Sequence, residues 1–288
     1  MSHADPDVTA TIAALVIYPV KSCAGVPVQE AVLTETGLDL DRAWMVVDAQ
    51  GCFVSQRELP RMALIRPQLK TYEIVLRAPG MLALHLAIDT VETPVRVEVW
   101  DDEVPAYDMG GVAAQWFSDF LGQPLRLVRF DPAHRRLSSL KWTGGIEAPN
   151  QFSDGFPVLV TSEASLDELN GRLAAAGHER VAMARFRPNL VLGGVQAHDE
   201  DRLDLLRIAT DAGVVALKPV KPCARCPIPN IDPATAAFSP AVGDTLQAYR
   251  QDGRLNGAVT FGMNAIVVQG DGLLLRVGQA VGADFRFD

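Results

Sequence analysis

The chain has 288 residues, of which 48% are hydrophobic and 21% charged, and 35 Asp and Glu side chains outweigh 26 Lys and Arg to give a net charge of −9. This composition is typical of a folded globular protein and excludes a disordered chain. A chain of this length builds a core without disulfides or a structural metal. Its acidity argues against nucleic acid or an anionic membrane as the main partner.

The cysteine content and the length of the apolar runs indicate the compartment. Four cysteines, Cys23, Cys52, Cys223 and Cys226, are too few for a secreted disulfide scaffold. The apolar run Ile12–Val20 is too short to span a bilayer, since a membrane helix needs about 18 apolar residues. No cationic leader precedes this run. We therefore expect a cytoplasmic protein without a membrane segment.

Residues 1–124 are predicted to form a β-barrel-like N-terminal domain. Val95–Trp100 has the clearest strand pattern, because valines alternate there with charged or larger residues. Glycine and proline turn signals separate the strands. Apolar residues spaced by three and four predict a helix at Gly111–Leu121. The predicted strands are Thr11–Tyr18, Val28–Thr34, Ala43–Asp48, Thr71–Arg77 and Val95–Trp100.

Residues 125–288 are predicted to form a second domain, again dominated by strands, with a few helices. The basic stretch His134–Asn150 is predicted to be a long exposed loop. Pro157–Thr161 is a strand that leads into an amphipathic helix at Ser162–Ala175, which Ser162 caps. The fold class is therefore α+β and β-dominated. The other predicted strands are Leu125–Phe130, Leu190–Leu192, Leu206–Thr210, Val214–Leu217, Thr245–Arg250, Asn264–Gln269 and Leu273–Val277.

Cys223 and Cys226 form a Cys-x-x-Cys pair among basic residues. A structural zinc site is one alternative, although it needs a second Cys or His pair at ligand spacing. A thioredoxin-like dithiol is another, although it needs a helix at the first cysteine, whereas Pro227 and Pro229 predict an extended segment. The pair can also be two inert thiols. The functional alternative is a single thiolate, a ligand or a nucleophile, on a stiff loop beside Arg225.

The segment Arg185–Asn189 places two arginines and an asparagine before a buried strand. Pro188 disfavours helical backbone at Arg187 and so favours an extended chain. On a strand, Arg187 and Asn189 share one face with the first arginine of the segment. That face is either a solvated surface or an anion-binding site. The apolar residues that follow at once favour the anion-binding site.

Two further segments place polar residues next to strands. Lys21 and Ser22 follow the buried strand that ends at Tyr18, but the upstream glycines of a nucleotide-phosphate loop are missing. Arg42 precedes a later strand and by itself is typical of a surface residue. Each of these signals is weak alone.

Taken together, these segments resemble those of one known family, the MOSC-domain proteins with a MOSC N-terminal β-barrel domain. The resemblance extends from about residue 11 to residue 285. Relatives include the mitochondrial amidoxime-reducing components and bacterial reductases of N-hydroxylated compounds. The matching motifs are Tyr18-Pro-Val-Lys-Ser-Cys23, Asp41-Arg42-x-Trp44, Ser153-Asp154-x-x-Pro157, Phe186-Arg-Pro-Asn189, Cys223-x-Arg225-Cys226 and Phe261-Gly262-x-Asn264.

The resemblance implies a molybdenum cofactor, in which a molybdopterin ending in a phosphate holds the metal. By position, Cys226 would be the thiolate on molybdenum, which suits a soft ligand. Asp154 would be a catalytic residue near the open metal positions. An association with pyridoxal phosphate also exists at the level of the family. The implied cofactor-binding residues are Lys21, Ser22, Arg42, Arg187, Asn189, Arg225 and Cys226.

The implied activity is the reduction of small N-hydroxylated substrates such as amidoximes, hydroxylamines or base analogues. The sequence has neither the Cys-x4-Cys-x2-Cys run of a ferredoxin cluster nor a Rossmann glycine fingerprint. We therefore expect no iron–sulfur cluster in this chain and a separate electron-transfer protein as partner. A non-catalytic carrier of molybdenum cofactor or sulfur is the main alternative, and a β protein with a zinc-bound cysteine pair is the third.

Overall fold

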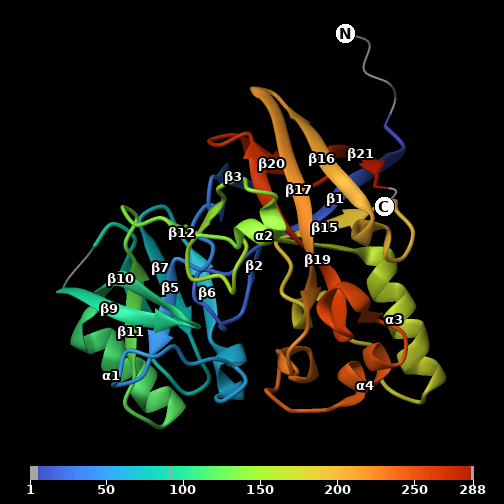
Figure 1. The fold of residues 1–288 in the computed structure, drawn as a ribbon. Helices are drawn as coiled ribbons and strands as arrows, with labels where there is room; N and C mark the ends of the chain where they lie inside the picture. The colour runs from blue at the N-terminus through green and yellow to red at the C-terminus, as the bar shows by residue number, and fades with distance from the viewer. Residues whose placement is uncertain (1–5, 91–92, 287–288) are drawn as a thin grey trace.

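The computed structural model describes residues 6–90 and 93–286. Its strands form two units that pack side by side, one built mostly from the N-terminal half of the chain and the other mostly from the C-terminal half (Figure 1). The larger unit is dominated by one extensive sheet, whereas the smaller unit has two smaller sheets. The expected α+β fold, dominated by strands, is confirmed.

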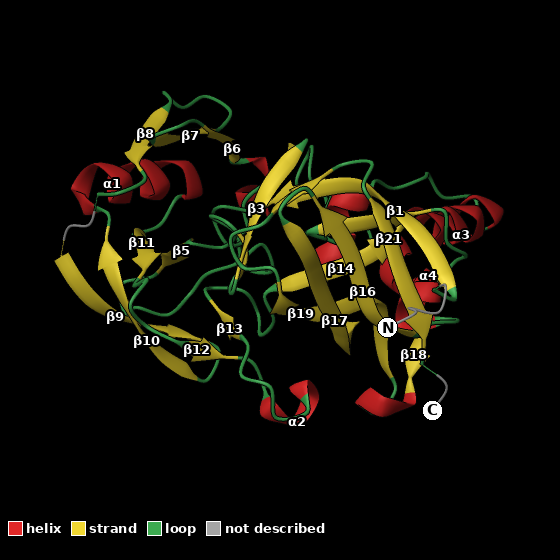
Figure 2. Cartoon of the chain, turned by 90° about the horizontal axis from the view of Figure 1, so that it is seen from above, coloured by secondary structure: helices red, strands yellow, loops and turns green. Residues whose placement is uncertain are grey.

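The larger unit is a closed barrel of seven strands. They follow one another in the order β14-β15-β1-β21-β16-β17-β19, and the pairing of β19 with β14 closes the ring. Figure 2 shows these strands on the side of the molecule away from α1. Buried aliphatic side chains such as Ile12, Leu192 and Leu217 belong to its core. The strands are β1 (Val8–Ile17), β14 (Val158–Ser162), β15 (Leu190–Gly193), β16 (Leu203–Thr210), β17 (Gly213–Ala224), β19 (Ala258–Gln269) and β21 (Ala280–Phe285); the two-residue β18 (Gln251–Asp252) pairs with β19.

The described part of the smaller unit contains two sheets that pack with helix α1. Helix α1 (Gly110–Leu121) contributes Trp116, Phe117 and Phe120 to a core that joins it to both sheets. On β9, Val97 and Val99 are buried and their neighbours are exposed, as the alternation predicts. One sheet has the order β5-β11-β10-β9 and the other β6-β7-β8. The strands are β5 (Trp44–Val47), β6 (Arg66–Leu69), β7 (Glu73–Arg77), β8 (Leu84–Ala87), β9 (Thr93–Val99), β10 (Asp102–Asp108) and β11 (Arg126–Phe130).

Several early strands hydrogen-bond with the C-terminal half of the chain. β1 lies between β15 and β21 in the barrel, with Val8 opposite Ala283. β2 (Val26–Val28) pairs with β1, while β3 (Glu30–Thr34) pairs with β20 (Leu274–Arg276) and with β4 (Gly37–Leu38). The chain enters the smaller unit only after these strands, so residues near the end of β1 lie where the two units meet.

Helices α3 (Glu163–Ala175) and α4 (Ala241–Gln247) pack together in a satellite core. Ser162 caps α3 as predicted, since its side chain accepts a hydrogen bond from the backbone N–H of Ser165 (3.1 Å). The prediction of a strand at Thr245–Arg250 is wrong, because α4 occupies much of that segment. Val242 and Leu246 are four residues apart and both are buried, which is the spacing of one helical face. Within the described residues, no helix is long and apolar enough to cross a membrane.

The stretch His134–Asn150 is more ordered than the predicted exposed loop. β12 (Arg136–Leu137) pairs with β13 (Pro149–Asn150), and the short helix α2 (Leu140–Thr143) lies between them. Arg136 and Asn150 are both buried, and the hydrogen bond from the arginine side chain to the amide oxygen of Asn150 (2.7 Å) offsets the cost of burying them. The composition of the stretch is typical of a loop, but the buried Arg136 side chain holds the stretch in place.

Candidate functional site

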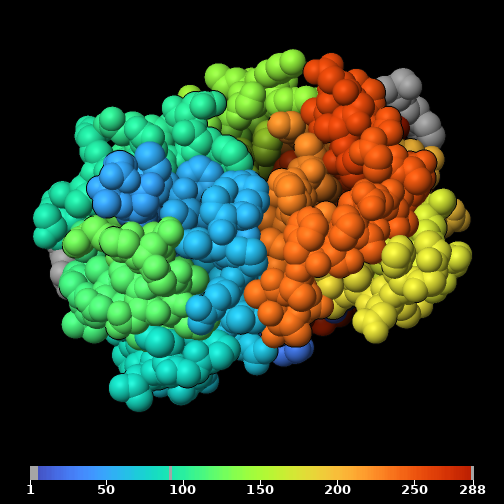
Figure 3. Space-filling model, turned by 90° about the horizontal axis from the view of Figure 1, so that it is seen from below, coloured from blue at the N-terminus to red at the C-terminus, as the bar shows by residue number. Residues whose placement is uncertain are grey.

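One pocket lies between the two units. It has a cavity volume of about 110 Å³, and Figure 3 shows the two halves of the chain meeting along a seam, blue and green against orange. Five of its lining side chains are cationic and one is a carboxylate, so the lining has a formal charge of +4 in a protein of net charge −9. The pocket brings together every predicted site residue: Lys21, Ser22, Arg42, Asp154, Arg187, Asn189, Arg225 and Cys226.

Three of these residues have left-handed backbone conformations. The φ angles are 66° at Ser22, 50° at Arg42 and 60° at Arg187. Non-glycine residues adopt this region only at a cost in stability, and such residues gather at functional sites. Surrounding contacts hold the conformations in place; for example, the buried amide of Gln56 donates to the carbonyl of Ser22 (2.6 Å).

Arg42 and Arg187 are both held against the buried ring of Tyr18. Their guanidinium carbons lie 4.4 Å and 4.3 Å from the ring centroid. Arg42 also donates to the carboxylate of Asp41 (2.5 Å), and Arg187 donates to the carbonyl of Cys23 (2.6 Å). Burial, together with Arg42, lowers the pKa of Arg187 to about 10, so Arg187 stays charged at neutral pH. Both guanidinium groups are therefore fixed cations.

Arg187 does not lie on a strand, and this part of the prediction is wrong. Met183–Arg185 forms a 3-10 turn, and the left-handed Arg187 follows it. Pro188 disfavours right-handed helical backbone at Arg187, and the residue adopts left-handed rather than extended backbone. The side chain of Arg185 consequently leaves the pocket and pairs with Asp232 (2.8 Å). Only the second arginine of the segment lines the pocket.

Asn189 has a positioning role that its sequence context does not reveal. Its amide oxygen accepts from the backbone N–H of Leu159 (3.1 Å) and from Arg42 (3.0 Å), and its amide nitrogen donates to the carbonyl of Val16 (3.2 Å). Asn189 therefore links β1 to β14 and orients Arg42. Its side chain is almost fully buried, with 1% exposed.

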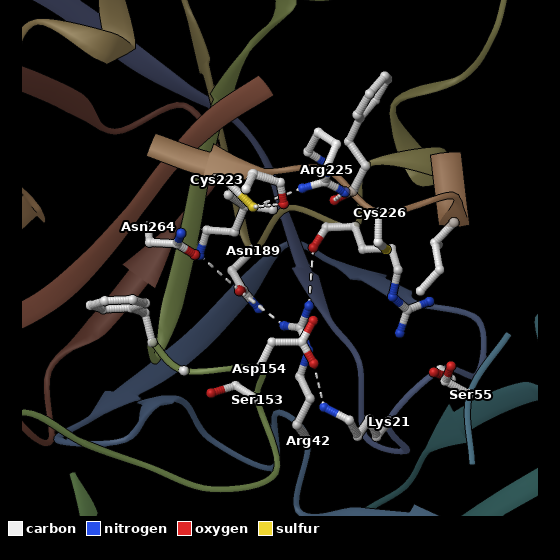
Figure 4. Close-up of a pocket in the computed structure, with 18 of the residues that line it drawn as sticks. Lys21, Arg42, Ser55, Ser153, Asp154, Asn189, Cys223, Arg225, Cys226 and Asn264 are labelled. Atoms are coloured by element: carbon white, nitrogen blue, oxygen red, sulfur yellow. Dashed lines mark hydrogen bonds and ion pairs between the residues drawn. The ribbon is translucent and has the colours of Figure 1, made fainter. Parts of the chain in front are cut away.

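The cysteine pair enters the pocket at the end of β17. Figure 4 shows Cys223, Arg225 and Cys226 on one side of the pocket, and Lys21, Arg42 and Asp154 on the other. Arg225 donates to the sulfur of Cys223 (2.9 Å) and to the carbonyl of Phe186 (2.9 Å). The Nε atom of Arg225 is buried without a hydrogen-bond partner, which leaves a donor for a ligand.

Both thiols of the pair are free and half-buried. The extended segment ends at Ala224, and a 3-10 turn at Ile228–Asn230 follows Cys226. The segment that contains Pro227 and Pro229 is therefore not extended as predicted. Within residues 6–90 and 93–286, no group of three or more His, Cys, Asp and Glu side chains could hold a metal ion, so the pair lacks zinc co-ligands there. Burial raises the pKa of Cys23 to about 12, so that nearby thiol stays protonated.

Lys21 and Asp154 form an ion pair at the pocket. The ammonium nitrogen of Lys21 lies 2.5 Å from the carboxylate of Asp154 and 2.8 Å from the carbonyl of Phe152. The side chain of Lys21 is 6% exposed and that of Asp154 is 66% exposed. Partial desolvation opposes ionisation of Asp154, but the charge of Lys21 outweighs it and holds the pKa of Asp154 well below its usual value. Asp154 is therefore ionised at neutral pH.

Replacing Asp154 by Asn removes the ion pair with Lys21 and should lower the free energy of unfolding at pH 7. The loss should be only about 1 kcal/mol, because water screens the exposed carboxylate. The folded-state pKa of Asp154 lies below its unfolded value, so the stabilisation is present at neutral pH. It shrinks below about pH 4 and is lost as the pH falls through the lowered pKa. Urea denaturation of the wild-type protein and the variant over this pH range checks the expectation. A difference in the free energy of unfolding that does not change with pH contradicts it.

Arg136 connects the Asp154 loop to the smaller unit. Its guanidinium donates to the carbonyl of Ser153 (2.7 Å) and to that of Gln151 (3.0 Å). Its Nε donates to Asp102 (2.7 Å), at the start of β10. The side chain of Arg136 is 7% exposed and that of Asp102 is 53% exposed, so the bond to Ser153 is buried and the bond to Asp102 is partly exposed. Arg136 thus fixes the residue before Asp154 relative to the β9–β10 hairpin.

Replacing Arg136 by Ala should lower the free energy of unfolding by about 3 kcal/mol, because several buried acceptors lose a charged donor. The neighbouring Arg135, whose side chain is 52% exposed in a pair with Glu35, is the matched control. Arg135→Ala should change stability by less than about 0.5 kcal/mol. Urea denaturation measures both variants, and equal small effects would show that the buried contacts of Arg136 do not stabilise the fold.

Sequence reasoning missed several lining residues. Ser55 and Arg57 come from a polar run after β5, and Phe156 follows the Asp154 loop. Asn264 was part of a family motif but had no assigned role, and it lies on β19. In the sequence, Arg57 is a cation shortly after two apolar residues. This pattern is common on protein surfaces and does not indicate a site. The pocket as a whole can bind an anion beside a thiol.

Comparisons with known proteins show which family the chain is similar to. The family model described as MOSC N-terminal beta barrel domain matches residues 9–124, and that of the MOSC domain matches residues 147–282. Mitochondrial amidoxime-reducing component 1 of Homo sapiens is 39% identical over 252 residues, which cover 84% of this chain and 72% of that protein. Mitochondrial amidoxime reducing component 2 of Homo sapiens is 35% identical, with 83% and 72% covered. Molybdenum cofactor sulfurase of Bos taurus is 29% identical, with 82% of this chain but 28% of that protein covered.

Proposed function

Because the chain belongs to the MOSC family, with an N-terminal MOSC β-barrel domain and a MOSC domain, we propose that it is a molybdenum-cofactor-dependent reductase of N-hydroxylated compounds. The observation that carries this proposal is one pocket in which five cations, a carboxylate and a free cysteine pair meet. The names of the two human relatives support amidoximes as the substrate class.

The donor set of the pocket fits a phosphate-bearing cofactor that is ligated through sulfur. Fixed guanidinium groups at Arg42 and Arg187 suit a phosphate, because they offer charged donors in rigid geometry. The unpartnered Nε of Arg225 leaves a buried donor for a cofactor acceptor. Cys226 would supply the soft thiolate ligand of molybdenum. Lys21 and Ser22 would complete the binding site at the end of β1.

When bound, the cofactor supplies the redox centre for a reaction that takes two electrons and two protons, converts an N-hydroxyl group to the amine or amidine, and releases water. Asp154 is ionised at neutral pH, so it accepts hydrogen bonds rather than donating a proton. We assign it the role of orienting the N–H groups of the substrate. Lys21 holds the carboxylate in place from its buried side.

Electrons are proposed to come from a separate redox protein in the cytoplasm, since the sequence carries neither cluster ligands nor a nicotinamide or flavin fingerprint. The test begins with metal and pterin analysis of protein purified from cells that make the cofactor. The purified protein should reduce benzamidoxime with reduced viologen but not with NADH alone. Protein that contains no molybdenum or pterin contradicts the cofactor proposal, and turnover with NADH alone contradicts the need for a partner.

The match to molybdenum cofactor sulfurase favours a second candidate function. The chain would then bind the cofactor, or its sulfur, without turning over an N-hydroxylated substrate. The two functions differ in one measurement. Cofactor-loaded protein that reduces no amidoxime or hydroxylamine with a chemical reductant supports the carrier function, and turnover excludes a purely passive role.

A further inference from the structure

Trp100 occupies a strained position at the tip of the β9–β10 hairpin. Val99 pairs with Asp102, so Trp100 and Asp101 form the turn, and Trp100 has a φ of 57°. A bulky residue with left-handed backbone is an outlier that glycine or asparagine would relieve. The residue is nevertheless 45% exposed, so core packing does not explain why a tryptophan stands here.

The contacts of Trp100 connect it to the pocket. Its indole N–H donates to the Oδ1 atom of Asp154 (3.3 Å). The guanidinium carbon of Arg57 lies 4.6 Å from the indole centroid, and the ring of Phe53 lies 5.0 Å away at an angle of 56°. Asp154 and Arg57 both line the pocket. Phe53, Arg57 and Trp100 therefore form an aromatic rim beside it.

The aromatic rim joins an exposed aromatic surface to the one carboxylate of the pocket lining. Because the indole nitrogen and the Asp154 oxygen are in hydrogen-bond contact, a group that binds to the Asp154 carboxylate lies within reach of the indole ring. An amidoxime presents N–H donors on a planar carbon, and in an aryl amidoxime the aromatic ring is attached to that carbon. Such a molecule can donate to Asp154 and stack on Trp100 at the same time.

We propose that Trp100 determines substrate specificity by stacking on a planar group attached to the N-hydroxylated amidine carbon. This inference rests on the proposed reductase function and names the substrates that the site favours, which are aryl amidoximes over alkyl amidoximes. Phe53 and Arg57 hold the indole ring in place through the contacts described above.

Benzamidoxime and acetamidoxime are the matched substrates, because they share the reacting group and differ in a phenyl or a methyl substituent. In Trp100→Ala, we expect KM for benzamidoxime to rise about tenfold and KM for acetamidoxime to change by less than about threefold. Trp100→Phe keeps an aromatic ring but lacks the N–H group, so it should restore most of the affinity for benzamidoxime. Tyr72→Ala removes an aromatic side chain that is 79% exposed outside the pocket lining and should change neither KM.

Molybdenum content, measured for each variant, separates substrate effects from cofactor loss. Equal losses on both substrates in Trp100→Ala and Trp100→Phe would show that Trp100 acts only by holding Asp154, and would overturn the inference. If the wild-type protein reduces neither amidoxime, the proposed function fails. The affinities of the unreduced protein for benzamidoxime and acetamidoxime, measured by calorimetry, then test the role of Trp100. A preference for benzamidoxime that disappears in Trp100→Ala supports stacking, and equal affinities of the wild-type protein for both compounds overturn it.

Discussion

Replacing Cys226 by Ser is expected to abolish amidoxime reduction, with a loss of at least about 10³-fold, as is typical when a group that holds the reacting centre is removed. The reason is that a hydroxyl group is a poor substitute for a soft thiolate on molybdenum. The change affects one half-buried side chain after β17, so the fold should persist. Viologen-linked activity, molybdenum content and the urea midpoint are the measurements.

Two other cysteines serve as controls. Cys223→Ser alters the group that accepts a hydrogen bond from Arg225, and we expect a partial loss of activity. Cys52 lies outside the pocket lining, beside Glu98, and Cys52→Ser should leave the activity unchanged. Lost activity in the Cys223 variant with retained activity in the Cys226 variant would reverse the assignment of the metal ligand.

The double replacement of Arg187 and Arg225 by Ala is expected to weaken retention of the cofactor by at least about 100-fold. Each arginine contributes a charged hydrogen bond of about 1.5–3 kcal/mol to a bound anion. The two changes halve the formal charge of the pocket lining from +4. Molybdenum and pterin remaining after dialysis measure the loss. High salt in the dialysis buffer should release the cofactor from the wild-type protein more readily than low salt.

The matched control removes two cations elsewhere on the surface. The side chain of Arg96 is 69% exposed and that of Arg207 is 46% exposed. Each pairs with a surface carboxylate. Their double replacement by Ala changes the net charge of the protein by the same amount. If this control loses as much cofactor as the pocket variant, the overall charge of the protein, not the pocket, governs retention.

The local pattern of the chain was sufficient to predict most strands and both longer helices. Alternation on Val95–Trp100 and the aromatic stripe of α1 each arise from contacts within one element, so they are visible in sequence. β21 was missed because Ala280–Phe285 contains alanine and glycine, and its extended form depends on pairing with β1 and β16. The partners of β1 in the barrel ring, β15 and β21, are likewise more than 160 residues distant, where local pattern carries no information.

The sequence predicted which residues lie together in the candidate site better than it predicted their backbone conformations. The eight site residues chosen from the motifs all lie in the pocket lining, although Arg187 is left-handed rather than extended. Arg57 and Trp100 were missed because a surface cation and a hairpin tryptophan have no distinctive spacing. Their importance arises from contacts between residues that are distant in the sequence, and only the folded structure contains those contacts.

The pairing of β1 with β21 in the barrel determines when the protein can finish folding. Val8 lies opposite Ala283, so β1 needs as its neighbour a strand that is synthesised much later. At about 5–20 residues per second, β1 waits on the order of tens of seconds for β21 to be synthesised. Until then one edge of β1 lacks its final partner, which is a hazard for pairing with other chains. Barrel closure therefore waits until β21 has been synthesised, and chaperones that shield extended apolar segments should protect the nascent chain during this interval.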